Sequence, residues 1–179
     1  MDPALLDRLR RGFPLRMDTA GRFWFEGDPL EHPRVVAYFR AHIDATTGGE
    51  PIIRVDGKYV HFTCDDTPLR ITHLTLADTT VQLTLDDDRV VPLDPSDVVD
   101  EDTAGILTHV PSQHSGRPLA ARFTNRAAVE LARWVEVEGE LAWLHIGGQR
   151  FPVTSAAPAA PPSRAYRSTG EAPEDLPQE

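Results

Sequence analysis

The feature that most constrains the fold of this 179-residue chain is a pair of glycine-containing turns, each set between two strand-like apolar runs. Asp56-Gly57 is the first, within residues 52–62, and Gly147-Gly148 is the second, within residues 142–153. Asp-Gly and Gly-Gly readily adopt the positive φ angles that two-residue hairpin turns require. The sequence therefore predicts one β-hairpin in each half of the chain.

Each predicted hairpin follows a stretch of helical periodicity. Pro33 and Thr124 are typical of the start of a helix, and glycines follow each stretch, so we predict helices over residues 33–46 and 124–138. One face of each helix is apolar at i, i+3 and i+7, and the second set repeats the first after 92 positions: Val36, Phe39 and Ile43, then Ala128, Leu131 and Val135. This agreement predicts an internal duplication, although two such units can also arise by chance.

The rest of the ordered chain has the pattern of strands. Six strands are predicted. The first two are expected to form a hairpin, and the third to fifth are expected to form an antiparallel meander. The predicted strands are, in chain order, residues 15–17, 22–25, 69–76, 80–85, 89–93 and 106–110.

These elements predict an α+β fold of two similar strand–helix–hairpin units with mostly antiparallel sheets. The first unit is expected over residues 15–98, including the meander, and the second over residues 99–154. A short N-terminal helix is expected over residues 1–14, with leucines that dock on the body of the protein. Residues 155–179 are rich in Ala, Pro and Ser and lack apolar periodicity, so a disordered C-terminal tail is predicted.

The composition excludes several classes of protein. The formal net charge of -10 opposes contact with a phosphate backbone, so we expect no nucleic-acid partner. No run approaches the roughly 18–20 apolar residues of a membrane helix, and the N-terminus lacks the apolar core of a signal peptide. We therefore expect a cytoplasmic protein without a membrane span. Cys64 is the only cysteine, so an internal disulfide and a cysteine metal cluster are both impossible.

No motif assigns a catalytic residue, a metal site or a cofactor. The sequence has neither the Gly-x-Ser-x-Gly of serine hydrolases nor a glycine-rich phosphate loop ahead of a helix. None of the seven histidines forms a metalloprotease-type pair, and Asp86-Asp87-Asp88 lacks the spaced ligands of a calcium loop. Cys64, at a strand end, is more typical of a small buried hydrophobe than of a nucleophile.

Two segments are candidates for binding a ligand. Asp66 lies just before Pro68, where its carboxylate can close a turn or face a cleft between the units. Arginines flank the start of the second predicted helix, which suits an anion, although charged residues are also common at a solvated helix end. The candidate ligand-binding residues are Asp66, Arg70, His73, Arg122, Asn125 and Arg126.

Residues 21–30, which read Gly-Arg-Phe-Trp-Phe-Glu-Gly-Asp-Pro-Leu and precede a predicted helix, resemble the opening of the bacterial family called domain of unknown function 1285. Asp66-Thr67-Pro68 resembles the Asp-x-Pro step of that family, and residues 127–131 resemble part of its second helix. Residues 66–74 and 91–95 are also similar, more weakly, to a related uncharacterised family.

The resemblance implies two similar α+β units with a ligand cleft between them. It also implies a role in signalling, with no known substrate. The chain departs from the family at Asn125, where relatives tend to have a basic residue, and this departure weakens the case for an anion site.

Three functions are compatible with these features. The leading hypothesis is a non-enzymatic regulatory module that binds a small molecule or a protein partner at the groove between the two units, since such grooves are common ligand sites. The alternative is a small enzyme with acid–base chemistry at the same groove, for instance with His73 and Asp66. The third is a pure interaction protein that uses its N-terminal helix and proline-rich tail as contacts.

Overall fold

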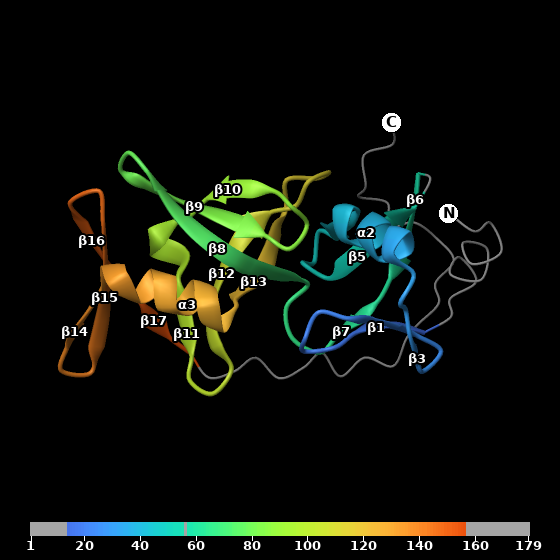
Figure 1. Cartoon of the computed structure of the whole chain (residues 1–179), viewed down its shortest axis with the longest axis horizontal. Helices are drawn as coiled ribbons and strands as arrows, with labels where there is room; N and C mark the ends of the chain where they lie inside the picture. The colour runs from blue at the N-terminus through green and yellow to red at the C-terminus, as the bar shows by residue number, and fades with distance from the viewer. Residues whose placement is uncertain (1–13, 56, 157–179) are drawn as a thin grey trace. The chain divides into compact units, whose positions relative to one another are not determined.

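The chain divides into two units in the computed structural model, which describes residues 14–55 and 57–156 (Figure 1). The first unit contains residues 14–68 and 111–119, and the second contains residues 69–110 and 120–156.

This division differs from the expected unit boundaries. The meander, expected in the first unit, belongs to the second, because its strand β8 (Leu69–Ala77) pairs in parallel with β13 (Pro118–Phe123). The expected N-terminal helix and most of the expected tail lie outside the described residues. The tail was expected to begin at Ser155, but that residue belongs to strand β17 (Thr154–Ser155), which pairs with another strand of the second unit.

Four short strands form one sheet of the first unit, in the order β3-β2-β1-β7. Strands β1 and β2 pair antiparallel, which confirms the predicted hairpin, whereas β1 pairs in parallel with β7. Cys64, in β7, is buried as predicted. The bounds are Leu15–Met17 (β1), Phe23–Phe25 (β2), Asp28–Pro29 (β3) and Thr63–Cys64 (β7).

Helix α2 (Pro33–Ala41) is followed by a three-stranded antiparallel sheet in the order β4-β5-β6. Strands β5 and β6 form the hairpin predicted around Asp56-Gly57, and Gly57 has a φ of 71°. The bounds are Ile43–Ala45 (β4), Pro51–Val55 (β5) and Lys58–His61 (β6).

The prediction that the first helix continues to residue 46 is wrong. The chain leaves the helix at His42 because Ile43–Ala45 pairs with β5, and sheet hydrogen bonds replace those of a longer helix. Gly49, expected to stop the helix, instead lies in the turn between β4 and β5. It has a φ of 78°, and its N–H donates to the carbonyl oxygen of Thr46 at 3.0 Å.

Seven strands form the large sheet of the second unit, in the order β10-β9-β8-β13-β12-β11-β17. Strands β8, β9 and β10 form the predicted antiparallel meander, and β12 contains the strand predicted at residues 106–110. A 3-10 turn, η1 (Pro95–Asp97), separates β10 from β11. The remaining bounds are Thr80–Leu85 (β9), Val90–Pro92 (β10), Val99–Glu101 (β11) and Gly105–Pro111 (β12).

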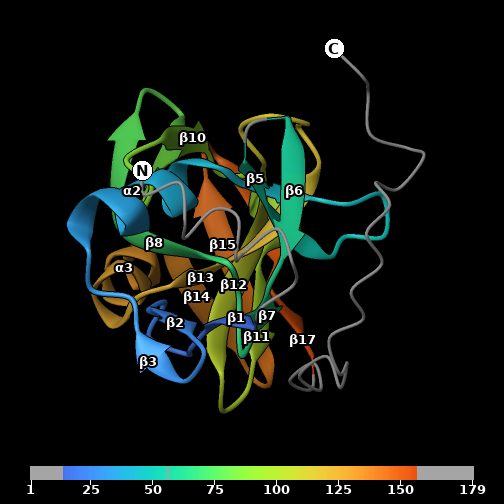
Figure 2. The same cartoon turned by 90° about the vertical axis from the view of Figure 1, so that its right-hand side faces the viewer.

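Helix α3 (Asn125–Leu131) lies beside β8 (Figures 1 and 2) and is followed by a 3-10 turn, η2 (Ala132–Trp134). The predicted continuation of this helix to residue 138 is wrong, because the sequence Val-Glu-Val-Glu alternates with the period of a strand and forms β14. The hairpin predicted at Gly147-Gly148 is confirmed. The three antiparallel strands are Val135–Glu138 (β14), Leu141–Ile146 (β15) and Gln149–Pro152 (β16).

Neither α-helix in the described residues is long and apolar enough to cross a membrane. Each is buried through two residues one turn apart, Val35 and Phe39 in α2 and Ala127 and Leu131 in α3. These pairs keep the 92-residue offset, and each helix precedes a three-stranded antiparallel sheet. Val36, however, is only half-buried. These shared features support the internal duplication, which stays a prediction.

Aromatic rings form the centre of the first unit. The ring of Phe23 in β2 meets those of Phe39 and Phe62 edge to face, with centroids 5.5 and 6.0 Å apart. In the second unit, β8 and β9 contribute large aliphatic side chains that are fully buried: Leu69, Ile71, Leu83 and Leu85. Each unit therefore has apolar packing of its own beneath its polar groups.

Candidate functional site

Five of the six candidate ligand-binding residues lie near the junction of β8, β13 and α3 in the second unit. Thr124, between β13 and α3, links the three elements through hydrogen bonds. Its hydroxyl donates to the carbonyl oxygen of Ile71 in β8 at 2.9 Å and accepts from the N–H of Ala127 at 3.3 Å. This side chain therefore caps the helix and joins it to the sheet.

Arg70 and Arg122 lie directly opposite each other in the parallel pair of β8 and β13. The guanidinium of Arg122 donates to the carboxylate of Glu101 at 2.7 Å and to the carbonyl oxygen of Gly105 at 2.9 Å. Both side chains of the Arg122–Glu101 pair are about nine-tenths buried. The Arg70 guanidinium donates to the carbonyl oxygen of Leu69 at 3.1 Å. The structure thus brings the two arginines together but gives both of them internal partners.

His73 and Arg126 share one carboxylate, that of Glu130 in α3. The Nδ1 atom of His73 lies 2.8 Å from Oε1 of Glu130, and the Nε atom of Arg126 lies 3.3 Å from the same oxygen. The backbone N–H of Leu74 donates to Oε2 of Glu130 at 2.8 Å. This backbone hydrogen bond, together with those from His73 and Arg126, lowers the pKa of Glu130. An ionised Glu130 holds the proton of His73 on Nδ1 and leaves Nε2 as the basic nitrogen.

The remaining candidates take no part in this cluster. Asn125 is exposed at the first position of α3. Asp66 belongs to the first unit, so the carboxylate beside His73 comes from Glu130 and not from the residue expected in the sequence. Glu130 was not among the sequence candidates. Its i,i+4 spacing from Arg126 was the available signal, but only the packing of α3 against β8 brings it to His73.

Two further histidines of the second unit pair with carboxylates. His109 lies 3.0 Å from Asp97, and His145 lies 2.9 Å from Glu136. Within residues 14–55 and 57–156, no three histidine, cysteine or acidic side chains form a group that could hold a metal ion.

A pocket of about 290 Å³ lies elsewhere in the second unit, between the turn of the β8–β9 hairpin and that of the β15–β16 hairpin. Its volume is near the lower end of the range for small-molecule sites, roughly 300–1,000 Å³. Among the residues that the structure describes, none with an ionisable side chain lines it. The lining residues are Thr79, Thr80, Val81, Leu93, Pro95, Ile146, Gly147, Gln149 and Phe151.

In the first unit, the buried carboxylate of Asp44 is the centre of a hydrogen-bond network. The side chain of Asp44 in β4 is fully buried. It accepts hydrogen bonds from the hydroxyl of Ser112, at 2.6 Å, and from that of Ser115, and it forms an ion pair with Arg54. Burial alone would raise the pKa of Asp44, but these donors outweigh it and lower the pKa to about 2. The bonds attach residues 111–119 to the β4–β5 sheet, so this network is structural.

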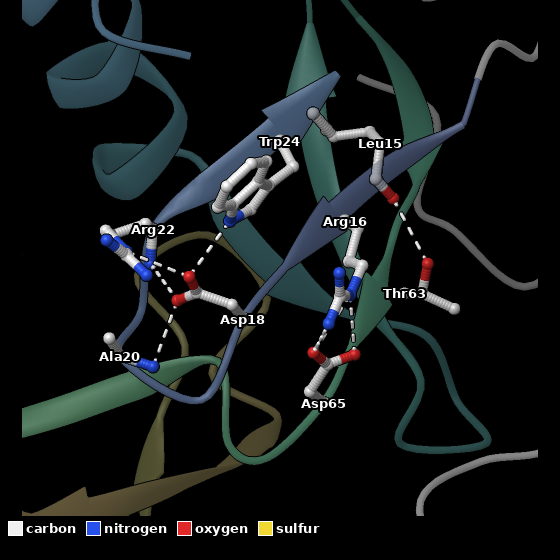
Figure 3. A network of polar contacts seen from close by, with 8 residues as sticks. All are labelled: Leu15, Arg16, Asp18, Ala20, Arg22, Trp24, Thr63 and Asp65. Carbon is white, nitrogen blue, oxygen red and sulfur yellow. Dashed lines mark hydrogen bonds and ion pairs between the residues drawn. The ribbon is translucent and has the colours of Figure 1, made fainter. Parts of the chain in front are cut away.

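The turn between β1 and β2 contains a second internal network (Figure 3). Asp18 accepts hydrogen bonds from the backbone N–H groups of Ala20 and Arg22 and from the indole of Trp24 at 2.9 Å. Burial opposes ionisation of Asp18, but the Arg22 and Trp24 donors lower its pKa to about 2. Figure 3 also shows Arg16 paired with the carboxylate of Asp65 across β1 and β7. These carboxylates stabilise the turn and the sheet.

Comparisons with known proteins identify the fold. No protein-family model matches the sequence, and no curated protein matches it. The crystal structure of a DUF1285 family protein from Silicibacter pomeroyi superposes with a TM-score of 0.62 over 80% of both chains, at 16% sequence identity. The chain has the fold of that DUF1285 protein.

The resemblance noted in residues 21–30 and 66–68 is therefore confirmed at the level of the fold. A second DUF1285 family protein, from Shewanella baltica, matches with a TM-score of 0.35 and 11% identity, over 79% of this chain and 84% of the other.

Proposed function

We propose that this protein is a non-enzymatic regulatory module and that the pocket of its second unit binds a small molecule. The carrying observation is that the nine described residues that line a pocket of about 290 Å³ include no ionisable side chain. Acid–base catalysis needs a titratable group within hydrogen-bond reach of the reacting atoms. A pocket without one is suited to recognition and not to proton transfer.

Several ionisable groups elsewhere in the second unit support this proposal, because they pair with one another. Arg122 pairs with Glu101, Arg89 pairs with Asp87, and Glu130 serves His73, Arg126 and the backbone of Leu74. Such pairs stabilise the packing of helix and strands. The exposed members of the original candidate set, Asn125 and Arg126, remain a proposed contact for a ligand or protein partner.

A fragment screen on the isotope-labelled full chain tests the proposal. Small fragments are expected to shift the backbone amide resonances of Thr80, Ile146 and Phe151. Gln149→Trp, which places an indole at the exposed edge of the pocket, is expected to abolish those shifts. Gln113→Trp makes the same exchange at an exposed position of the first unit and is the matched control. A library that leaves the three resonances unmoved in the folded native chain would refute binding in the pocket.

A second candidate function rests on the geometry of His73. Its side chain is 42% exposed and that of Glu130 is 13% exposed, so a largely buried carboxylate orients an imidazole that solvent can reach. This arrangement is typical of general-base histidines. A panel of ester, amide and phosphoester substrates tests the enzyme hypothesis. Turnover that disappears in both His73→Gln and Glu130→Gln, with His109→Gln unaffected, would favour an enzyme over the binding module.

A further inference from the structure

Resting on the proposed function, we infer that the pocket of the second unit selects uncharged molecules that join an apolar ring or chain to an amide or hydroxyl group. The inference comes from the chemistry of the lining residues and from the directions in which their strand neighbours point.

The floor of the pocket consists of apolar side chains whose backbone is held by sheet hydrogen bonds. Val81, Leu93 and Ile146 are all at least nine-tenths buried, and the N–H of Leu93 donates to the carbonyl oxygen of Val81 at 2.8 Å. The ring of Phe151 is half-buried beside them. This floor matches an aromatic or aliphatic body, whose burial removes apolar surface from water.

The polar groups of the pocket are all neutral. The polar lining residues are Thr79 in the β8–β9 turn and Thr80 at the start of β9, which carry hydroxyls, and Gln149 of β16, which carries a carboxamide. Hydroxyls and amides both donate and accept, so they complement an amide or hydroxyl on the ligand. A charged ligand would lose hydration here without meeting an opposite charge, which is unfavourable.

The basic side chain nearest to the lining residues in the sequence, Arg150, does not point into the pocket. Gln149 and Phe151 line the pocket, whereas Arg150 between them points to the opposite face of β16. There its guanidinium lies 4.1 Å from the centroid of the Trp143 ring and pairs with Glu138. His145, which precedes the lining residue Ile146, likewise faces Glu136. None of the described residues that line the pocket therefore offers a basic side chain to a carboxylate or phosphate.

The acid between two lining residues, Asp94, has little influence on the pocket. Asp94 lies between the lining residues Leu93 and Pro95, and its carboxylate accepts from the hydroxyl of Ser96 at 2.6 Å and from its N–H at 3.0 Å. These hydrogen bonds lower the pKa of Asp94, so the group is negative at neutral pH. It is exposed and does not line the pocket, so a cation gains little from it across water.

Three probes of nearly equal size test the inference: benzamide, benzoate and benzylammonium, each titrated at pH 7 into the labelled full chain. Benzamide is expected to shift the amide resonances of Thr80, Ile146 and Phe151, with an affinity at least about tenfold higher than that of either ion. Gln149→Glu adds a carboxylate at the pocket edge and is expected to raise the relative affinity for benzylammonium.

Gln113→Glu is the matched control, because Gln113 is exposed, belongs to the first unit and does not line the pocket. It is expected to leave the preference unchanged. If benzoate or benzylammonium shifts the pocket resonances of the native chain with the same affinity as benzamide, the inference is overturned while the proposed function stands. If all three probes and the fragment library leave those resonances unmoved, the proposed function itself fails.

Discussion

Gly147 and Thr79 approach each other so closely that a side chain has no room between them. A Cβ atom on Gly147 would lie 2.9 Å from the carbonyl oxygen of Thr79 and 3.3 Å from its Cβ. The two residues belong to different hairpin turns of the second unit, and both line its pocket. Gly148, the next residue, also has a positive φ, of 75°, but a Cβ there would have nothing within 4 Å.

Gly147→Ala is therefore expected to destabilise the protein more than Gly148→Ala. Both substitutions force a non-glycine residue into the left-handed region, at a cost of about 1 kcal/mol. Only the first adds a clash with backbone, which brings its expected cost to roughly 2–4 kcal/mol. Urea unfolding of the two variants measures the difference, and equal costs would contradict the close approach.

Ser112→Ala is expected to destabilise the first unit through Asp44. The two side chains meet at 2.6 Å although they are 68 positions apart, and the carboxylate of Asp44 has no access to water. Loss of one donor to a buried charge costs roughly 1–3 kcal/mol. Ser96→Ala, which removes an exposed hydroxyl from Asp94, is the matched control and is expected to cost less than about 1 kcal/mol. Equal midpoints in urea would show that Asp44 does not depend on Ser112.

Acid is expected to weaken the first unit through Asp18 and Asp44. Both have a folded pKa of about 2, below the value of about 3.9 for an unfolded aspartate. Depressed carboxyl pKa values stabilise the fold fully above the unfolded pKa, and this contribution disappears as the pH falls through the folded pKa. The free energy of unfolding should therefore decrease between about pH 4 and pH 2.

Urea unfolding at a series of pH values measures that slope. Asp44→Asn removes one of the two titrating groups, so its curve should be shallower than that of the native chain. Asp100→Asn, at an exposed position of β11, should leave the slope unchanged. A native curve that is flat between pH 4 and pH 2 would contradict the assigned pKa values.

The parts of the fold that were predicted correctly depend on local sequence. Asp56-Gly57 and Gly147-Gly148 specify hairpins within a few residues, because a two-residue turn determines which strands meet. Residues 43–45 were wrongly assigned to a helix, since Ile43 fits the apolar stripe of α2 and only pairing with β5 makes it a strand. Non-local pairing of this kind leaves no periodic signal in the segment itself.

The polar sites show the same limit more strongly. Arg126 and Glu130 could be paired from their helical spacing, but the contact of Glu130 with His73 spans 57 positions and requires α3 to lie on β8. The sequence around Asp44 does not indicate burial, because the contact that buries it comes from residues 111–119, far away in the chain. The pocket combines turns from two hairpins, so none of its residues could be selected by a motif.

Val35→Ala against Val36→Ala tests which face of α2 is buried. The predicted stripe was centred on Val36, with Val35 only widening it, but Val35 is 6% exposed and Val36 is half-buried. Both variants gain the same helix propensity, so their difference reports packing alone. Val35→Ala is expected to cost about 2 kcal/mol and Val36→Ala less than about 1 kcal/mol, because a buried deletion also leaves a cavity. Urea unfolding measures both, and a larger loss for Val36→Ala would restore the predicted stripe and reject the packing of α2 through Val35 and Phe39.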